Sequence, residues 1–232
     1  MIAKNERLTR VLCLIAVCLL PALFPVRASE SHTPVADSRY ACNAGDMTGC
    51  VNLGIYYDTG QGIAQDSVKA AAIFRKACDR KSAAACHNLA VLYDKGRGVT
   101  QDKAIAAQLY EQACAGDYAG ACANLAIIYS DGQGVTQDKA KVVEFYGKAY
   151  DAALVGSCVN LGNLYNAGDG VAQDKAKAVA LYTKACDAGN KAGCFNLAIA
   201  YESGSGVTQD KAKATELYQK ACSLGYQPAC KN

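Results

Sequence analysis

The chain has 232 residues, of which 51% are hydrophobic and 19% are charged, with 13 cysteines, 21 glycines and no tryptophan. This composition excludes an intrinsically disordered chain. Four of the 24 basic residues and one of the 21 acidic residues lie in the first 28 positions, so the rest of the chain carries no net charge. A neutral chain argues against charge-driven binding of nucleic acid and against adhesion to an anionic membrane surface.

The N-terminal segment has the three parts of a secretory signal peptide. Basic and polar residues precede an apolar run from Val11 to Phe24, and Val26 and Ala28 are the small residues expected before a cleavage site. This run of 14 residues, at about 1.5 Å per helical residue, is too short for a bilayer core of about 30 Å. The sequence therefore predicts a signal peptide at residues 1–28 and an exported chain, periplasmic or secreted, with no membrane span after cleavage.

From residue 37 onward the sequence repeats with a period of 36 residues. Two series of cysteines recur at this interval, and each repeat also contains Asn-Leu, a tyrosine, a Gly-x-Gly pair and an aspartate. One cysteine series has no gap: Cys50, Cys86, Cys122, Cys158, Cys194 and Cys230. The other is interrupted by one tyrosine: Cys42, Cys78, Cys114, Tyr150, Cys186 and Cys222. We expect a short extension at residues 29–36 and five full repeats with partial ends over residues 37–232.

Each repeat contains two amphipathic helices, which we call helix A and helix B. In one helix A the positions i, i+3, i+4 and i+7 hold Cys86, Leu89, Ala90 and Tyr93. The next helix B has the same spacing in Ala106, Leu109, Tyr110 and Ala113. Gly96 suits the left-handed end of helix A, and Asp102 suits the start of helix B. Neither helix can bury its apolar face alone, so the repeats are predicted to stack into an all-α solenoid without a second domain.

These motifs resemble the Sel1-like repeat. The pattern Gly-Cys-x-Asn-Leu-Gly/Ala-x-x-Tyr, Gly-x-Gly-Val, Asp-x-x-x-Ala and Tyr-x-Lys-Ala-Cys covers about residues 37–232, and five copies agree. The cysteines narrow the resemblance to a secreted branch, the Helicobacter cysteine-rich proteins. The resemblance implies a right-handed α/α superhelix, related to tetratricopeptide arrays, with helix A on the concave side.

Five pairs of cysteines share the spacing Cys-x7-Cys, which joins the end of a helix B to the start of the next helix A. In an exported chain this spacing predicts structural disulfides, because antiparallel helices with a short loop bring the two Cα atoms into range. The expected pairs are Cys42–Cys50, Cys78–Cys86, Cys114–Cys122, Cys186–Cys194 and Cys222–Cys230. Metal binding is the weaker interpretation, since the spacing is not that of a zinc site and His32 and His87 are the only histidines. We expect no metal and no cofactor.

Cys158 has no partner, because Tyr150 occupies the expected position. Its main interpretation is a free, buried thiol that acts as a small hydrophobe in a monomer. Two alternatives stay open, namely a reactive thiol and an intermolecular disulfide that joins a dimer. No histidine lies near Cys158 in the sequence, which argues against a catalytic nucleophile.

The resemblance raises the question of β-lactam chemistry, because some cysteine-rich members of the family are described as penicillin-binding proteins or weak β-lactamases. A serine β-lactamase needs Ser-x-x-Lys, and this string is absent. Two histidines are too few for a zinc enzyme. We therefore name no catalytic residue, and the binding or weak hydrolysis of β-lactams stays an alternative that rests on the resemblance alone.

A row of asparagines is the first candidate for a binding site. One lies two residues after each cysteine of the uninterrupted series: Asn52, Asn88, Asn124, Asn160 and Asn196. Asparagine is a poor helix former, so its recurrence within helices needs a reason. The carboxamides could bind the backbone of an extended peptide or form internal hydrogen bonds between repeats, and both interpretations stay open.

Positions that differ between repeats are candidates for specificity. The residues three positions after the asparagines are Ile55, Val91, Ile127, Asn163 and Ile199. His87 and Phe195 each follow a cysteine directly. If these positions face a groove, it is mostly apolar, with polar interruptions at His87 and Asn163. We predict a non-enzymatic scaffold that binds a protein or extended peptide through the concave helix A face, with an adaptor for the cell envelope or peptidoglycan as a further alternative.

Overall fold

The computed structural model describes residues 33–231, and the predicted signal peptide lies outside the described residues. The described part contains eleven α-helices, a C-terminal 3-10 helix and no strand. The elements are α1 (Pro34–Asn43), α2 (Met47–Thr59), α3 (Ser67–Asp79), α4 (Ala83–Lys95), α5 (Lys103–Ala115), α6 (Ala119–Asp131), α7 (Lys139–Asp151), α8 (Val155–Ala167), α9 (Lys175–Asp187), α10 (Lys191–Ser203), α11 (Lys211–Ser223) and η1 (Gln227–Lys231).

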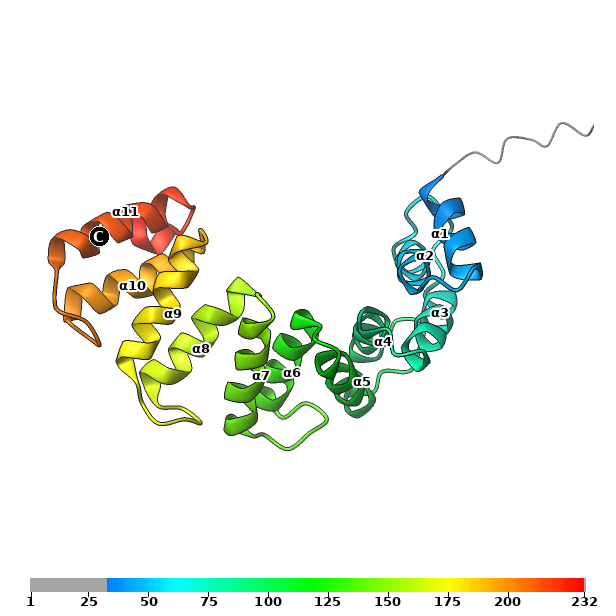
Figure 1. The fold of residues 1–232 in the computed structure, drawn as a ribbon, viewed down its shortest axis with the longest axis horizontal. Coiled ribbons are helices and arrows are strands. Elements are labelled where there is room, and N and C mark those ends of the chain that lie inside the picture. Colours follow the sequence, from blue (N-terminus) through cyan, green and yellow to red (C-terminus); the bar gives the residue numbers. More distant parts are fainter. Residues whose placement is uncertain (1–32, 232) are drawn as a thin grey trace, which may run out of the picture. The chain divides into compact units, whose positions relative to one another are not determined.

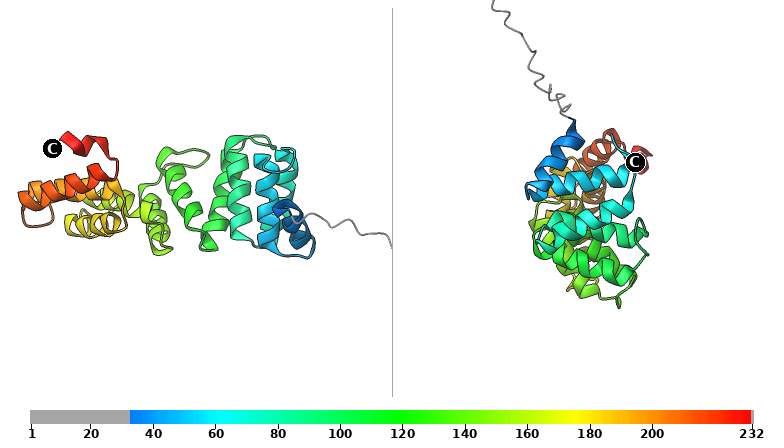
Figure 2. Two further views of the ribbon diagram at one scale, coloured as in Figure 1. Left: turned by 90° about the horizontal axis from the view of Figure 1, so that it is seen from above. Right: turned by 90° about the vertical axis from the view of Figure 1, so that its right-hand side faces the viewer.

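Helices A and B alternate along this chain. The even-numbered helices from α2 to α10 are helix A, and the odd-numbered helices from α3 to α11 are helix B. The first described helix, α1, lies at the register of a helix B. Each helix packs against the next one along the chain, as Figures 1 and 2 show. The predicted all-α solenoid of 36-residue repeats is confirmed.

The residues predicted to end helix A and begin helix B do so. Gly96 ends α4 with a φ of 67°, in the left-handed region that favours glycine. The Asp102 carboxylate then accepts hydrogen bonds of 2.9 Å from the backbone N–H groups of Ala104 and Ile105. Both arrangements recur in every repeat, because the equivalent glycines all have positive φ and the equivalent aspartates all cap a helix B.

A glutamine in each turn also ties the two helices of a repeat together. Gln101 Nε2 donates a hydrogen bond of 2.7 Å to the backbone carbonyl of Asp94, in the last turn of α4. The same contact is formed by Gln65, Gln137, Gln173 and Gln209. These bonds satisfy carbonyl groups that have no partner at the end of a helix. The turn is therefore held by its glutamine as well as by the predicted glycine and aspartate.

The five predicted disulfides are present, and each joins the last turn of a helix B to the following helix. Their Cα–Cα distances run from 4.3 Å in Cys42–Cys50 to 4.9 Å in Cys222–Cys230. A set of five disulfides is typical of a chain that folds in an oxidising compartment outside the cytosol. Within residues 33–231, no helix is both long enough and apolar enough to cross a membrane.

Helix B ends at a position where the backbone is left-handed in every repeat. Three of these positions hold glycine and three do not: Gly45, Lys81, Asp117, Ala153, Gly189 and Gly225. Ala153 has a φ of 64°, which is strained for a residue with a Cβ atom.

We expect Ala153→Gly to raise the free energy of unfolding by about 1 kcal/mol, because glycine adopts this conformation without steric cost. The reverse change, Gly189→Ala, is expected to lower it by a similar amount, since a Cβ there would meet no atom within 4 Å and only the strain is added. Urea denaturation followed by circular dichroism measures both changes. A loss of stability in Ala153→Gly would contradict this explanation.

Candidate binding surface on the helix A face

Helix A exposes an apolar side chain at the same register in most repeats. This row, the isoleucine row, contains Ile55, Val91, Ile127, Asn163 and Ile199. The side chains of Ile127, Ile199 and Ile55 are 46%, 43% and 37% exposed. Single exposed apolar residues are common on protein surfaces. Their recurrence at one register makes this row a candidate surface for a partner.

The asparagine row lies one helical turn before the isoleucine row, and it takes part in bonds inside the protein. Two asparagines form hydrogen bonds with tyrosines of the preceding helix B: Asn124 with Tyr110, and Asn160 with Tyr146. On the helix B that precedes Asn88, the residue equivalent to Tyr110 and Tyr146 is Phe74, which has no hydroxyl group. Asn88 instead donates a hydrogen bond of 2.8 Å to the carbonyl of Ala84. Internal bonding therefore accounts for part of the asparagine pattern.

The same asparagines nevertheless stay at the protein surface. Asn52 and Asn160 are exposed, and Asn88, Asn124 and Asn196 are partly exposed. A carboxamide has two donor hydrogens and an acceptor oxygen, so one internal bond does not use its full capacity. The two interpretations of the row are thus compatible, because an asparagine held by one bond can offer its other groups to a partner.

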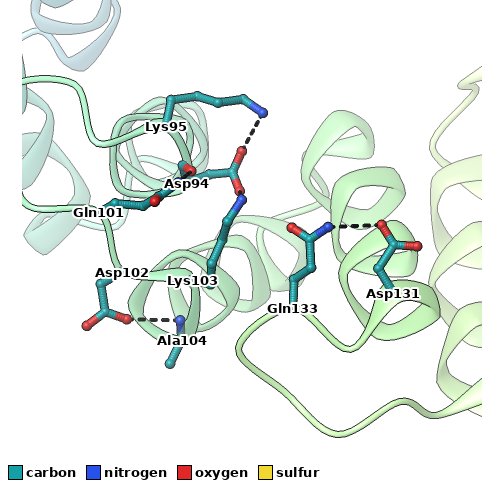
Figure 3. A network of polar contacts seen from close by, with 8 residues as sticks. All are labelled: Asp94, Lys95, Gln101, Asp102, Lys103, Ala104, Asp131 and Gln133. Carbon is teal, nitrogen blue, oxygen red and sulfur yellow. Dashed lines mark hydrogen bonds and ion pairs between the residues drawn. The ribbon is translucent and has the colours of Figure 1, made fainter.

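One pocket on this face lies between α4, α5 and α6 and has a volume of about 280 Å³. Its walls are Val91, Asp94, Lys95, Lys103, Tyr110, Asn124, Ile127, Ile128 and Gln133. Residues of the isoleucine and asparagine rows therefore meet in it. Figure 3 shows Lys95 and Lys103 both reaching the Asp94 carboxylate, and Gln133 extending toward Asp131.

Burial and neighbouring groups shift the pKa values of Asp94 and Tyr110 in this pocket. Partial burial alone would raise the pKa of Asp94, but hydrogen bonds from Lys103 and Lys95 outweigh it and hold the pKa below its usual value. Burial raises the pKa of Tyr110 to about 12, although the hydrogen bond with Asn124 opposes this shift. At neutral pH the Asp94 carboxyl is therefore ionised and the Tyr110 phenol is neutral.

A second pocket lies at the equivalent place two repeats further on, between α8, α9 and α10, with a volume of about 190 Å³. Its walls are Asn163, Asn166, Tyr182, Asn196, Ile199, Ala200, Ser203 and Ser205. Seven of these eight residues occupy positions that also line the first pocket, 72 residues earlier. Amide and hydroxyl groups replace the charges of the first pocket. The helix A face therefore contains two pockets at equivalent positions, and different chemical groups line them.

The other predicted binding residues, Asn163, His87 and Phe195, all form contacts inside the protein. Asn163 lies in the isoleucine row, where its Oδ1 accepts hydrogen bonds from Tyr182 at 2.8 Å and Asn196 at 3.0 Å. His87 and Phe195 are half-buried and pack against aromatic rings, unlike the isoleucines. The nearest ring centroids lie 4.6 Å from His87, at Tyr118, and 4.8 Å from Phe195, at Tyr226. Burial lowers the pKa of His87.

The described residues contain one free cysteine. Cys158 is free and 5% exposed, and it packs beside Tyr150. Burial raises the pKa of its thiol, so the protonated form dominates at neutral pH. Within residues 33–231, no three side chains of histidine, cysteine, aspartate or glutamate are grouped to hold a metal ion.

The repeat unit matches a known family along most of the chain. The Sel1 repeat family model matches five consecutive segments, at residues 48–82, 83–118, 119–154, 155–190 and 191–226. The chain belongs to the Sel1 repeat family. No curated protein gave a significant sequence match to this Sel1 repeat protein.

Two solved structures share this fold, and a third gives a weaker match. A protective antigen present in uropathogenic Escherichia coli strains, which displays an SLR fold, is 32% identical, with a TM-score of 0.78 over 83% of this chain and 41% of the antigen. The chain thus spans less than half of that protein. A Sel1 repeat protein from Oxalobacter formigenes is 22% identical, with a TM-score of 0.72 over 84% of each chain. Cysteine-rich protein B of Helicobacter pylori is 29% identical over 53% of this chain and 89% of its own, with a TM-score of 0.43.

Proposed function

We propose that this Sel1 repeat protein binds an extended segment of a protein partner through its helix A face. The observation that carries the proposal is the exposure of Ile55, Ile127 and Ile199 at one register. Apolar side chains of a partner would cover these isoleucines, and the neighbouring asparagines would bind its backbone groups. The recurring pockets would receive individual side chains of the partner.

The expected affinity of each repeat is modest. Covering the exposed part of one isoleucine contributes about 1–2 kcal/mol at about 25 cal/mol per Å². The cost of ordering the partner offsets much of this gain. Tight binding therefore requires several repeats to engage the same segment at once, which an array of equivalent sites makes feasible.

We also propose that the chain acts in the periplasm or as a secreted protein after cleavage of residues 1–28. The five disulfides support an oxidising compartment. A partner in the cell envelope, including a protein bound to peptidoglycan, would be compatible with this location. In that case the protein would act as an adaptor that holds its partner in place.

Selection of a peptide from a displayed random library tests the proposed face. We expect Ile127→Glu to weaken binding of the selected peptide at least about tenfold, because the carboxylate would be buried against apolar groups. The matched control is Ile105→Glu, which changes a 37% exposed isoleucine on a helix B. This control is expected to bind within about twofold of the unchanged protein. Equal losses in both variants would contradict the proposal.

The enzymatic alternative has its own test, the hydrolysis of a chromogenic cephalosporin by the oxidised chain. The binding proposal predicts no multiple turnover. Turnover that scales with protein concentration and disappears on reduction and unfolding would contradict a purely binding role. A variant with Cys158→Ser would then show whether the free thiol is involved.

A further inference from the structure

The repeat pattern is broken on helix α7. Gly147 occupies a position where the other helices hold a larger residue: Arg39, Arg75, Glu111, Thr183 and Gln219. At three of these places the side chain covers the tyrosine of the next helix A: Arg39 contacts Tyr57, Arg75 contacts Tyr93, and Glu111 contacts Tyr129. Gly147 has no side chain to make this contact with the next helix A, and a Cβ built there would meet no atom within 4 Å. Tyr150, which replaces a disulfide cysteine, follows one turn later.

A pocket of about 360 Å³ opens at this break, between α7, α8 and α9. Its walls are Val143, Gly147, Tyr150, Asp151, Leu161, Tyr165, Lys177, Ala180, Leu181 and Lys184. None of these residues lines either pocket of the helix A face. Leu161 and Leu181 are each only 5% exposed, so the base of the pocket is apolar. The three helices that form it follow one another in Figure 1.

Two ammonium groups and two phenols lie at the mouth of this pocket. Lys177 Nζ donates a hydrogen bond of 2.7 Å to the Tyr165 hydroxyl, and Lys184 Nζ donates one to the Tyr150 hydroxyl. In the described part of the chain, neither lysine has a carboxylate within ion-pair distance. Asp151 is the one acidic residue of the lining, so the pocket has a net positive charge above an apolar base.

We propose that this pocket binds a small apolar group that carries one carboxylate. The hydrocarbon part would pack on Leu161 and Leu181, and the carboxylate would accept charge-assisted hydrogen bonds from Lys177 and Lys184. The volume lies at the lower end of the range for ligand pockets, which favours a short ligand. A medium-chain fatty acid and the C-terminal leucine of a peptide both have this chemistry.

The test closes the pocket without changing its charged residues. Gly147→Gln introduces the residue found at the equivalent Gln219, and the open space above Gly147 lets the variant fold. Thr183→Gln makes the same residue at the equivalent position of the next helix B, and it is the matched control. Calorimetry with the oxidised chain would compare octanoate with octanol, and N-acetyl-leucine with its amide.

We expect octanoate or N-acetyl-leucine to bind the unchanged chain and Thr183→Gln, and to bind Gly147→Gln at least about tenfold more weakly. The tighter of the two acids identifies the source of the carboxylate. A second variant, Lys184→Gln, is expected to weaken binding of the acid and not of its neutral analogue. The proposal fails if neither acid binds, or if Gly147→Gln binds as tightly as Thr183→Gln.

Discussion

Gly98→Ala is expected to lower the free energy of unfolding by about 3 kcal/mol, because the new methyl group adds both backbone strain and a steric overlap between repeats. Gly98 is the second glycine of its turn and has a φ of 67°. A Cβ at this position would lie 2.2 Å from the backbone carbonyl oxygen of Ser67, at the start of the preceding helix B. The same close approach recurs at Gly134, Gly170 and Gly206. The second glycine is therefore needed for contact between repeats.

Gly189→Ala is the matched control, because Gly189 also has a positive φ but has open space around its Cβ position. Backbone strain alone predicts that Gly189→Ala lowers the free energy of unfolding by about 1 kcal/mol. Urea denaturation of both variants separates backbone strain from the overlap between repeats. Equal losses in Gly98→Ala and Gly189→Ala would show that the close approach has no energetic importance.

The double change Cys114→Ala and Cys122→Ala removes one disulfide. We expect it to lower the free energy of unfolding by about 2–3 kcal/mol. The crosslink closes a short loop and restricts the unfolded chain. Because each repeat contacts mainly its neighbours, hydrogen exchange is expected to accelerate in α5 and α6 and much less in α10 and α11.

Cys158→Ala is the control for this double change, since it removes one buried sulfur and no crosslink. Its expected cost is about 1 kcal/mol. Hydrogen exchange monitored by mass spectrometry, together with urea denaturation, measures both effects. A cost for Cys158→Ala that equals the cost of removing the disulfide would contradict a stabilising role for the crosslink.

The fold was predictable because each signal occurs in several copies. One glycine or aspartate is weak evidence for a helix end, but Gly96 and Asp102 recur at the same register in every repeat. The cysteine spacing likewise predicted the disulfide partners from local geometry. The turn glutamines, Gln101 and its equivalents, also recur with this period, but one sequence pattern does not reveal which carbonyl group each of them binds. The periodic signal was present, and only the bonding partner required the structure.

The binding surface was less predictable, because it depends on which way each side chain points. The sequence indicated the asparagine and isoleucine rows, but not that Asn124 bonds Tyr110 of another helix. It treated His87 and Phe195 as equivalent to the isoleucines, whereas packing against nearby rings half-buries both. Each pocket is formed by side chains of three consecutive helices, so its walls depend on how those helices pack. No local pattern predicts such a site, although Gly147 was visible as a break in the repeat.

Isoleucine methyl NMR of the oxidised chain, titrated with a peptide selected for binding, tests the helix A face most directly. The proposed function predicts that the methyl signals of Ile55, Ile127 and Ile199 shift together. Ile73 and Ile105, which lie on helix B, are expected to keep their signals unchanged. Shifts confined to Ile73 and Ile105 would place the binding surface on the other helices and contradict the proposed function.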